Sequence, residues 1–354
     1  MTIIDYIEIS FIKGLGNRRI KQIYETFGCV SEVLKEPELL VDSFGYSIYR
    51  TVKNRPESLR LKAEEEYRKA EKTGAEIITL GDSRYPQLLK EIPDPPPYIY
   101  VKGYLPEGDF ISVVGSRKFS GYGEEVTRKL VDTLVENGIV VVSGLATGID
   151  SIAHSRCVEK GGLTVAVLGN GIDLIFPPEN RRLYSRILDS GAVISEFPVG
   201  TVASRFTFPK RNRIIAGLST ATIVTEAGEK SGALITAGLA NDYGRTVFTV
   251  PTNINNPYGK GNNILLKEGA VPLTRPEDIF EHLPYLLKRN EESNTASSLT
   301  QLEKQILGLI NEAVPIDILA EKTGMGISDL TVVLFEMEMK ELIRIKDGMV
   351  YRGI

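Results

Sequence analysis

The central part of the chain alternates short apolar runs with amphipathic stretches. Two helical patterns, YGEEVTRKLVDTLVENG and GALITAGLANDYG, lie among runs that are rich in Val and Ile. These apolar runs are EIITL, YIYV, FISVVG, IVVVSG, LTVAVLG, AVISEF, ATIVTEA and TVFTV. Near-continuous Val and Ile runs are typical of strands that are buried on both faces of a parallel sheet. The pattern therefore predicts a doubly wound, mostly parallel α/β domain over residues 71–287.

Residues 1–70 show helical periodicity instead. Apolar side chains recur every three or four positions on both sides of KGLGN, where Gly14 and Gly16 permit a tight turn. A helix, a glycine turn and a second helix resemble a SAM or helix-hairpin-helix domain, whose turn presents backbone N–H groups to a phosphate. A helical bundle that serves only packing explains the same pattern, so both interpretations stay open.

The end of the chain predicts a separate small domain. The polar stretch KRNEESNTASS (288–298) predicts a linker. In residues 299–354, three helical patterns precede IRIKDGMVYRG, a hairpin with an Asp-Gly turn, and this order predicts a winged-helix-like domain. Its third helical pattern carries Asp329, Glu336, Glu338 and Glu341, where a DNA reader needs cations and amides. The acids favour a packing or protein-contact role for this domain.

Candidate chemistry gathers in the loops that follow the predicted strands. These loops are GSRKFSGYG (115–123), GLATGID (144–150) and GEKSGALIT (228–236). Their small residues and cations include Gly115, Ser116, Arg117, Gly144, Lys230, Ser231 and Gly232. Ligands of an open α/β sheet bind beyond the carboxyl ends of its strands, and helix N-termini there favour anions. The loops therefore predict an anion-binding site.

A fourth basic segment, FPKRNR (208–213), precedes the apolar face of a predicted helix. The whole chain is acidic, with 42 Lys and Arg against 46 Asp and Glu, so this local cluster opposes the global charge. We expect Asn212 to cap the helix and to place Lys210 and Arg211 at its mouth. The cluster would then join the three loops in one pocket.

Composition and motifs exclude several classes of protein. No segment has 18 consecutive apolar residues, so we expect no membrane helix, and the N-terminus lacks a signal-peptide pattern, so we expect a cytoplasmic protein. Two Cys and two His residues predict neither a metal site nor a disulfide framework. GxxxxGK[ST], GxGxxG and GxSxG are missing, so we expect no bound cofactor and no nucleophile elbow. A catalytic set of Asp150, His154 and Glu226 is the weaker interpretation.

Several motifs follow one another in a specific order through residues 110–275. They are VVGSRKFSGYG, VSGLATGIDSIAH, VLGNGIDLIFPPENRRLY, SEFPVGT, FPKRNRIIAGLS and TEAGEKSGALITAGLA. In this order they resemble the DNA-processing protein A family (DprA, also called Smf). The resemblance implies an extended Rossmann-like domain that binds single-stranded DNA and forms a homodimer. It also implies that the protein protects the strand and loads RecA recombinase onto it during natural transformation, without catalysing a reaction.

The resemblance also assigns residues to the DNA pocket. By analogy, they are Arg117, Lys210, Arg211, Asn212, Arg213 and Lys230. Phe206 and Phe208 flank the basic turn and are candidates to stack on bases, although burial in the core explains them equally well. A structural role for Arg211 or Arg213, paired with Glu196 or Glu226, also stays open.

A nucleotide-processing hydrolase on a related Rossmann-like fold is the rival hypothesis. Such enzymes carry a glycine-rich turn and a glutamate, and TEAGEKSG resembles that arrangement. Lys230 and Ser231 stand where those enzymes have a Gly-Thr loop, which argues against this assignment. Release of the base from nucleoside monophosphates distinguishes the two hypotheses.

Overall fold

The computed structural model describes residues 3–287, 301–310, 313–339, 342–346 and 348–352. The chain divides into two compact units, residues 1–283 and 284–354. The segment 288–298, which the sequence predicts as a linker, lies outside the described residues.

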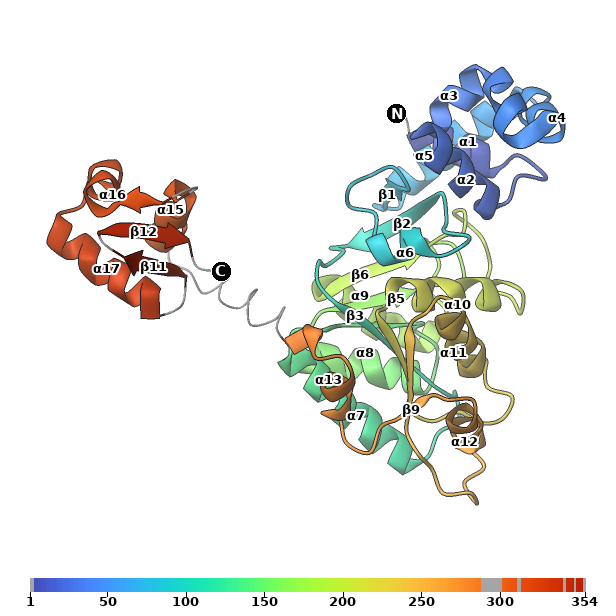
Figure 1. The fold of residues 1–354 in the computed structure, drawn as a ribbon. Coiled ribbons are helices and arrows are strands. Elements are labelled where there is room, and N and C mark those ends of the chain that lie inside the picture. The colour runs from blue at the N-terminus through green and yellow to red at the C-terminus, as the bar shows by residue number, and fades with distance from the viewer. Residues whose placement is uncertain (1–2, 288–300, 311–312, 340–341, 347, 353–354) are drawn as a thin grey trace. The chain divides into compact units, whose positions relative to one another are not determined.

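A nine-stranded sheet forms the centre of the first unit, in the order β1-β2-β6-β5-β4-β3-β7-β8-β9 (Figure 1). The strands are β1 (Glu76–Thr79), β2 (Tyr98–Gly103), β3 (Phe110–Val114), β4 (Val140–Ser143), β5 (Thr164–Val167), β6 (Gly191–Ser195), β7 (Ala221–Val224), β8 (Thr246–Thr249) and β9 (Val271–Pro272). From β6 to β9 all neighbours are parallel, whereas β1 and β2 form an antiparallel edge. The predicted mostly parallel α/β fold is confirmed.

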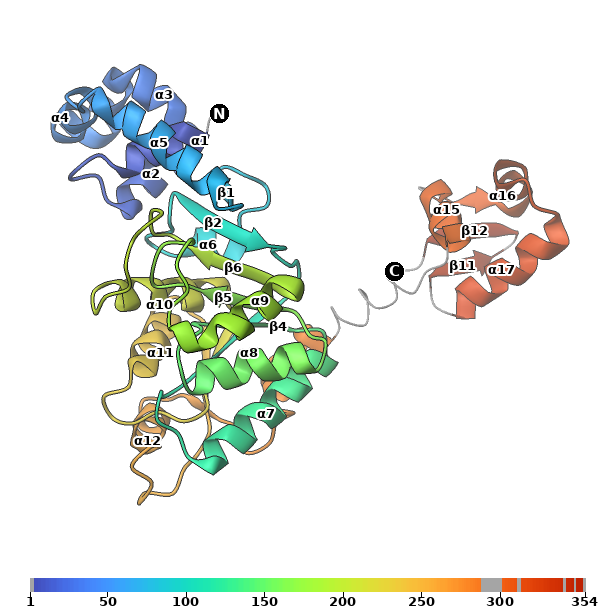
Figure 2. The same ribbon diagram turned by 180° about the vertical axis from the view of Figure 1, so that it is seen from behind.

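Helices cover both faces of this sheet (Figures 1 and 2). One face carries α7 (Gly121–Glu136), α8 (Ile149–Glu159) and α9 (Arg181–Asp189), and the other carries α6 (Gln87–Glu91), α10 (Thr207–Leu218) and α11 (Gly232–Asp242). Every residue of β3, β4, β5, β6 and β7 is buried. Burial from both sides explains why these strands are continuous apolar runs rather than alternating ones.

The strand order reverses at β3, which lies between β4 and β7. The chain proceeds from β3 through β4 and β5 to β6, and then crosses back to β7 on the other side of β3. The loops after β3 and β7 consequently lead to helices on opposite faces of the sheet. Such a switch point opens a crevice at the carboxyl edge of an α/β sheet, where ligands bind.

Five helices precede the sheet, and the first and the last of them contact its edge strand β1. They are α1 (Ile3–Ser10), α2 (Asn17–Phe27), α3 (Val30–Lys35), α4 (Leu40–Lys53) and α5 (Ser58–Lys72), with a 3₁₀ turn at Pro37–Leu39. Gly14 has a φ of +88°, as the predicted turn requires, and Gly16 precedes α2. The buried carboxylate of Glu66 on α5 accepts hydrogen bonds from the Tyr100 hydroxyl (2.5 Å) and the Val199 N–H (2.7 Å). Residues 1–70 therefore share one unit and one core with the sheet.

The sheet is followed by α12 (Lys260–Lys267) and α13 (Asp278–His282). The second unit contains α15 (Gln301–Leu309), β10 (Val314–Pro315), α16 (Ile316–Thr323), α17 (Ile327–Met339), β11 (Ile343–Lys346) and β12 (Met349–Arg352). β12 lies between β10 and β11 in an antiparallel sheet. Three helices and a two-stranded wing make the predicted winged-helix fold. The third helix, α17, exposes Val332 and Phe335 rather than cations.

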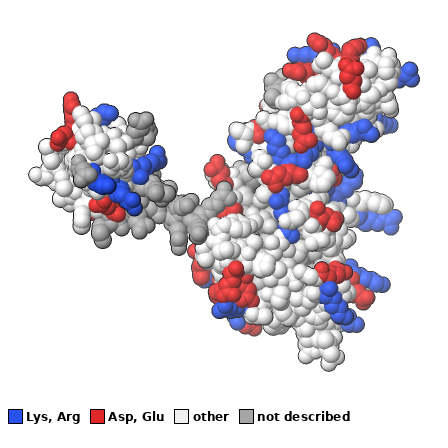
Figure 3. Space-filling model, in the orientation of Figure 1, with Lys and Arg blue, Asp and Glu red and all other residues white. Residues whose placement is uncertain are grey.

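Acidic and basic side chains are interspersed over the face of the first unit that Figure 3 shows. The net charge of the chain is −4. A ligand of either sign would therefore be recognised by local charges rather than by a broad surface field. Among the residues that the structure describes, no helix is long and apolar enough to cross a bilayer.

Candidate anion-binding site

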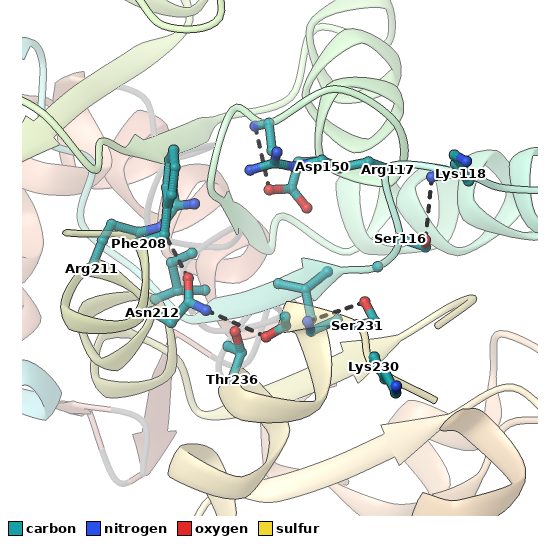
Figure 4. A pocket seen from close by; sticks show the side chains of 16 residues that line it. Ser116, Arg117, Lys118, Asp150, Phe208, Arg211, Asn212, Lys230, Ser231 and Thr236 are labelled. Atoms are coloured by element: carbon teal, nitrogen blue, oxygen red, sulfur yellow. Dashed lines mark hydrogen bonds between the residues drawn. The ribbon is translucent and has the colours of Figure 1, made fainter. Parts of the chain in front are cut away.

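A cavity of about 330 Å³ opens at the switch point, among the loops after β3, β4 and β7 and the start of α10 (Figure 4). Nine of the twelve residues predicted for the site line it. They are Gly115, Ser116, Arg117, Phe208, Arg211, Asn212, Lys230, Ser231 and Gly232. Gly144 lines a smaller cavity of about 70 Å³ that shares Arg117, Ala146 and Phe208 with the first. Loops that are far apart in the sequence thus form one site, as the strand-exit argument predicts.

Two predicted residues, Lys210 and Arg213, do not line either cavity. Lys210 is exposed to solvent. The Arg213 guanidinium is buried and forms ion pairs with Glu196 and with Asp94 (3.5 Å). An α-helix turns about 100° per residue, so Arg213 lies on the face of α10 opposite Arg211. The structure therefore supports the structural alternative for Arg213, with Glu196 as its partner.

The predicted helix cap at Asn212 is wrong, because α10 begins earlier. The helix starts at Thr207, and the preceding turn is closed by hydrogen bonds between Ser204 and Thr207. Pro209 lies in the first turn, where a backbone N–H has no acceptor within the helix. Its lack of an N–H therefore costs no hydrogen bond. Asn212 is therefore in the second turn, where its Oδ1 accepts from Arg211 Nε (3.1 Å) and its Nδ2 donates to Gly232 O (3.3 Å).

Arg211 is a buried cation that joins α10 to two strand ends. Its side chain donates to Gly144 O and Val167 O, both at 2.5 Å, and the residue is only 4% exposed. Burial lowers the pKa of Arg211 to about 10, while the nearby Asp150 carboxylate opposes this shift. The guanidinium therefore remains charged at neutral pH, and its electrostatic field reaches the cavity.

The predicted glycines have two different roles. A Cβ atom on Gly144 would lie 2.4 Å from Arg211 Nη1, and one on Gly115 would lie 2.6 Å from the Ile149 side chain. These two glycines therefore make room for protein atoms rather than for a ligand. Gly232 has nothing within 4 Å of its Cβ direction. It begins α11, whose first turn carries no acidic residue, so this helix N-terminus is open to an anion.

Aromatic rings border the cationic side of the cavity. The Phe208 ring has the Arg117 guanidinium 5.3 Å and the Arg211 guanidinium 5.9 Å from its centroid, and Phe176 lies 5.9 Å away. Phe206 is 67% exposed and contacts Arg205 at 4.8 Å. Neither Phe206 nor Phe208 is buried in the core, and only Phe208 lines the cavity.

Four cations line the cavity, of which Arg211 is buried and Arg117, Lys118 and Lys230 are exposed. Among the described residues, Arg117, Lys118, Arg211 and Lys230 line the cavity and form no ion pair. Arg156, by comparison, pairs with Asp132 at 2.6 Å. The sequence analysis included Lys118 only as part of its loop and did not predict it as a site residue. Its position beside Arg117 could have indicated that it lines the cavity. Four cations without a direct ion pair, one of them next to the N-terminus of α11, make this cavity a candidate anion-binding site.

The catalytic set considered from the sequence does not assemble. Asp150 lines the cavity, and burial raises the pKa of its carboxyl group. His154 is fully buried with Nδ1 2.7 Å from Thr164 Oγ1, and burial lowers its pKa to about 3, so it stays neutral at physiological pH. Glu226 is also fully buried and bonded to Ser120 and Asn256. Neither His154 nor Glu226 lines the cavity.

No cluster of three or more potential metal ligands occurs in the part of the chain that the structure describes. Cys29 and Cys157 are both free thiols. The cavity is lined by cations, one amide side chain, hydroxyls and a single carboxylate, Asp150, which is too few ligands to hold a metal cation. Its chemistry suits a phosphate or a carboxylate.

The fold and the cavity together define a doubly wound α/β protein with a candidate anion-binding site at its switch point. The family model described as DNA recombination-mediator protein A matches residues 76–284, and that of the DprA winged helix domain matches residues 290–349. The chain belongs to the DNA recombination-mediator protein A family, also known as DprA or Smf. The resemblance seen in the sequence motifs is thereby confirmed.

Relatives are similar over most of the chain. Protein Smf of Synechocystis is 34% identical in an alignment of 387 positions, gaps included. The alignment covers 97% of this chain and 96% of that protein. The crystal structure of DNA processing protein A from Streptococcus pneumoniae is 33% identical, with a TM-score of 0.61 over 75% of this chain and 97% of that one. The Helicobacter pylori protein, solved for its single-stranded DNA binding mode, is 28% identical, with a TM-score of 0.54 over 60% of this chain and 98% of that one.

Proposed function

We propose that this protein binds and protects single-stranded DNA and helps to load a RecA recombinase onto it, in natural transformation or DNA processing. The observation that carries the proposal is the group of four cations, Arg117, Lys118, Arg211 and Lys230, that line one cavity without carboxylate partners. The single-stranded DNA binding of the Helicobacter pylori relative supports it. We further propose that the protein is cytoplasmic and works as a homodimer formed through the Rossmann-like domain.

The cavity offers what a single strand needs. Arg117 and Lys118 on one loop, and Lys230 at the open N-terminus of α11, can hold backbone phosphates. Phe208 lies at the same site and offers a ring face to an unpaired base, whatever its identity. Bases of a duplex are stacked on one another and out of reach of such a cavity. We therefore propose a preference for single strands without strong sequence dependence.

Of the three groups considered for catalysis, only Asp150 lines the cavity, so the rival function, hydrolysis of nucleotides, has no assembled catalytic set. A general base needs a free acceptor within reach of the substrate. Glu226 accepts three hydrogen bonds and does not line the cavity, and His154 is fully buried. We therefore propose a binding protein rather than an enzyme. Incubation with nucleoside monophosphates should release no free base, and release of base would favour the rival.

The direct test is a gel shift with single- and double-stranded oligonucleotides of equal length, repeated over a salt series. The wild-type protein should bind the single strand more tightly. Arg117→Ala should weaken this binding, whereas the control Arg128→Ala should not, because Arg128 lies outside the cavity and pairs with Glu124 (3.1 Å). Equal or tighter binding to the duplex would contradict the proposal.

Recombinase loading and dimerisation need separate measurements. The family description as a recombination mediator supports the first. We expect the protein to restore RecA filament formation on a strand covered by a single-strand-binding protein, and to sediment as a dimer. A monomer that binds single strands but does not affect RecA would limit the function to strand protection.

A further inference from the structure

We infer that Glu226 is a positioning residue, whose buried carboxylate holds the Ser116–Ser120 loop in the geometry with which this loop binds phosphate. The inference rests on the proposed function, because it concerns the same cavity. Glu226 lies two residues beyond the end of β7 and is fully buried. It does not line the cavity, so any effect on a ligand must pass through the residues that it contacts.

Glu226 binds both ends of the loop that follows β3. Its Oε2 accepts from the Ser120 N–H (2.6 Å) and its Oε1 accepts from the Ser120 hydroxyl (2.7 Å). At the other end, the Ser116 N–H donates to the backbone carbonyl of Glu226 (2.8 Å). Arg117 and Lys118, two of the cavity's unpaired cations, stand between these attachment points. One residue thus fixes the segment that carries them.

The same carboxylate reaches a third loop and the first turn of α7. Asn256, in the loop between β8 and α12, donates from Nδ2 to Glu226 Oε1 at 2.8 Å. A Cβ atom on Gly123 would lie 2.4 Å from Glu226 Oε2, so the helix start packs directly against the carboxylate. The loops after β3, β7 and β8 therefore meet on one side chain.

A carboxylate suits this position because an ionised one is an acceptor only. The N–H of Ser120, the hydroxyl of Ser120 and the amide of Asn256 all donate to it. No described cation forms an ion pair with Glu226, so its partners are neutral donors, which include the N-cap residue of α7. The positive end of the α7 dipole stabilises the buried charge. The cations of the loop therefore remain available for a ligand.

The test is a double-mutant cycle measured as affinity for a labelled oligodeoxythymidylate. In the otherwise wild-type chain, Glu226→Ala should weaken binding roughly tenfold. This is about the effect of losing one charge-assisted hydrogen bond that holds the loop. The isosteric Glu226→Gln keeps one acceptor but places an NH2 donor against a donor of the loop, so it should weaken binding less than Glu226→Ala does. In an Arg117→Ala/Lys118→Ala background, Glu226→Ala should change the affinity by less than about twofold, because the loop then carries no cation to position.

An equal loss in both backgrounds would overturn the inference, because Glu226 would then act on binding by another route. Wild-type affinity in Glu226→Ala would overturn it as well. If Glu226→Ala does not fold, Ser120→Ala replaces it in the cycle, since it removes one donor to Glu226 and keeps the N–H contact. Failure of the wild-type chain to bind single strands would instead refute the proposed function, so the two failures are distinct.

Discussion

Each of the two faces of α10 carries a buried arginine, and the two arginines have partners of different charge. On one face, Arg213 is neutralised by the carboxylates of Glu196 and Asp94. On the other face, Arg211 donates to backbone carbonyls and to Asn212, and no carboxylate pairs with it directly. A guanidinium held by neutral acceptors keeps its charge available to a ligand. We propose that direct pairing with a carboxylate, rather than burial or residue type, separates the structural cation Arg213 from the cation of the candidate site, Arg211.

The largest expected effect is on stability, at the paired face. Arg213→Ala removes the guanidinium partner of the buried Glu196 carboxylate. The substitution should lower the free energy of unfolding by about 3–5 kcal/mol. Burial raises the pKa of Glu196, so the folded state of the variant gains from a proton at acidic pH and the loss should be smaller there. Urea unfolding at two pH values measures both effects. Arg128→Ala, at a surface pair, is the control and should cost less than about 1 kcal/mol.

The next effect tests the unpaired face. Arg211→Ala leaves Gly144 O and Val167 O without their donor and should cost about 2 kcal/mol of stability. It should also weaken single-strand binding, because the cavity loses a charge. Arg211→Lys should rescue neither property fully, since one ammonium group does not reproduce the planar donor geometry. Unaltered binding by a folded Arg211→Ala protein would show that the charge of Arg211 does not reach the ligand.

Arg117→Ala should affect binding alone. Its side chain makes no ion pair among the described residues, so the melting temperature should stay near that of the wild type. Affinity for a single strand should fall roughly tenfold, and the slope of log K against log salt should become shallower by about 0.7, the contribution of one phosphate contact. A salt titration by fluorescence anisotropy measures both quantities. An unchanged slope would mean that Arg117 contacts a base or the protein instead of a phosphate.

The smallest effect is expected at Lys210. This residue is exposed and does not line either cavity, although it is close enough to contribute to the electrostatic environment of Glu196. Lys210→Ala should leave stability within about 0.5 kcal/mol of the wild type and should reduce affinity much less than Arg117→Ala. A salt slope reduced as much as in Arg117→Ala would show that the strand runs over the exposed start of α10.

The sequence was sufficient to predict most of the fold. All eight predicted apolar runs form strands where they were predicted, and five of these strands, β3 to β7, are buried throughout. The antiparallel edge of β1 and β2 was not predictable, because strand direction depends on connections rather than on the composition of a strand. The shared core of residues 1–70 and the sheet was missed for a similar reason. Its contacts, such as that between Glu66 and Val199, join residues 133 positions apart.

The loops of the candidate site and most of its lining residues were predictable, but the partners of the individual side chains were not. Glycines and cations after the strands located the cavity correctly, since topology alone brings those loops together. The different environments of Arg211 and Arg213 depend on Gly144, Val167 and Glu196, which lie on distant segments. The start of α10 was misplaced because Asn212 resembles a helix cap, whereas Ser204 and Thr207 close the turn.

The buried Glu66 carboxylate has a consequence for folding during translation. Its partner Val199 lies 133 residues further along the chain, and Tyr100 lies 34 residues further. At about 5–20 residues per second, a ribosome needs roughly 7–27 s to advance from Glu66 to Val199. During that interval Glu66 does not yet have the Val199 N–H that it binds in the folded chain. The N-terminal segment should therefore complete its packing only after strand β6 has left the exit tunnel.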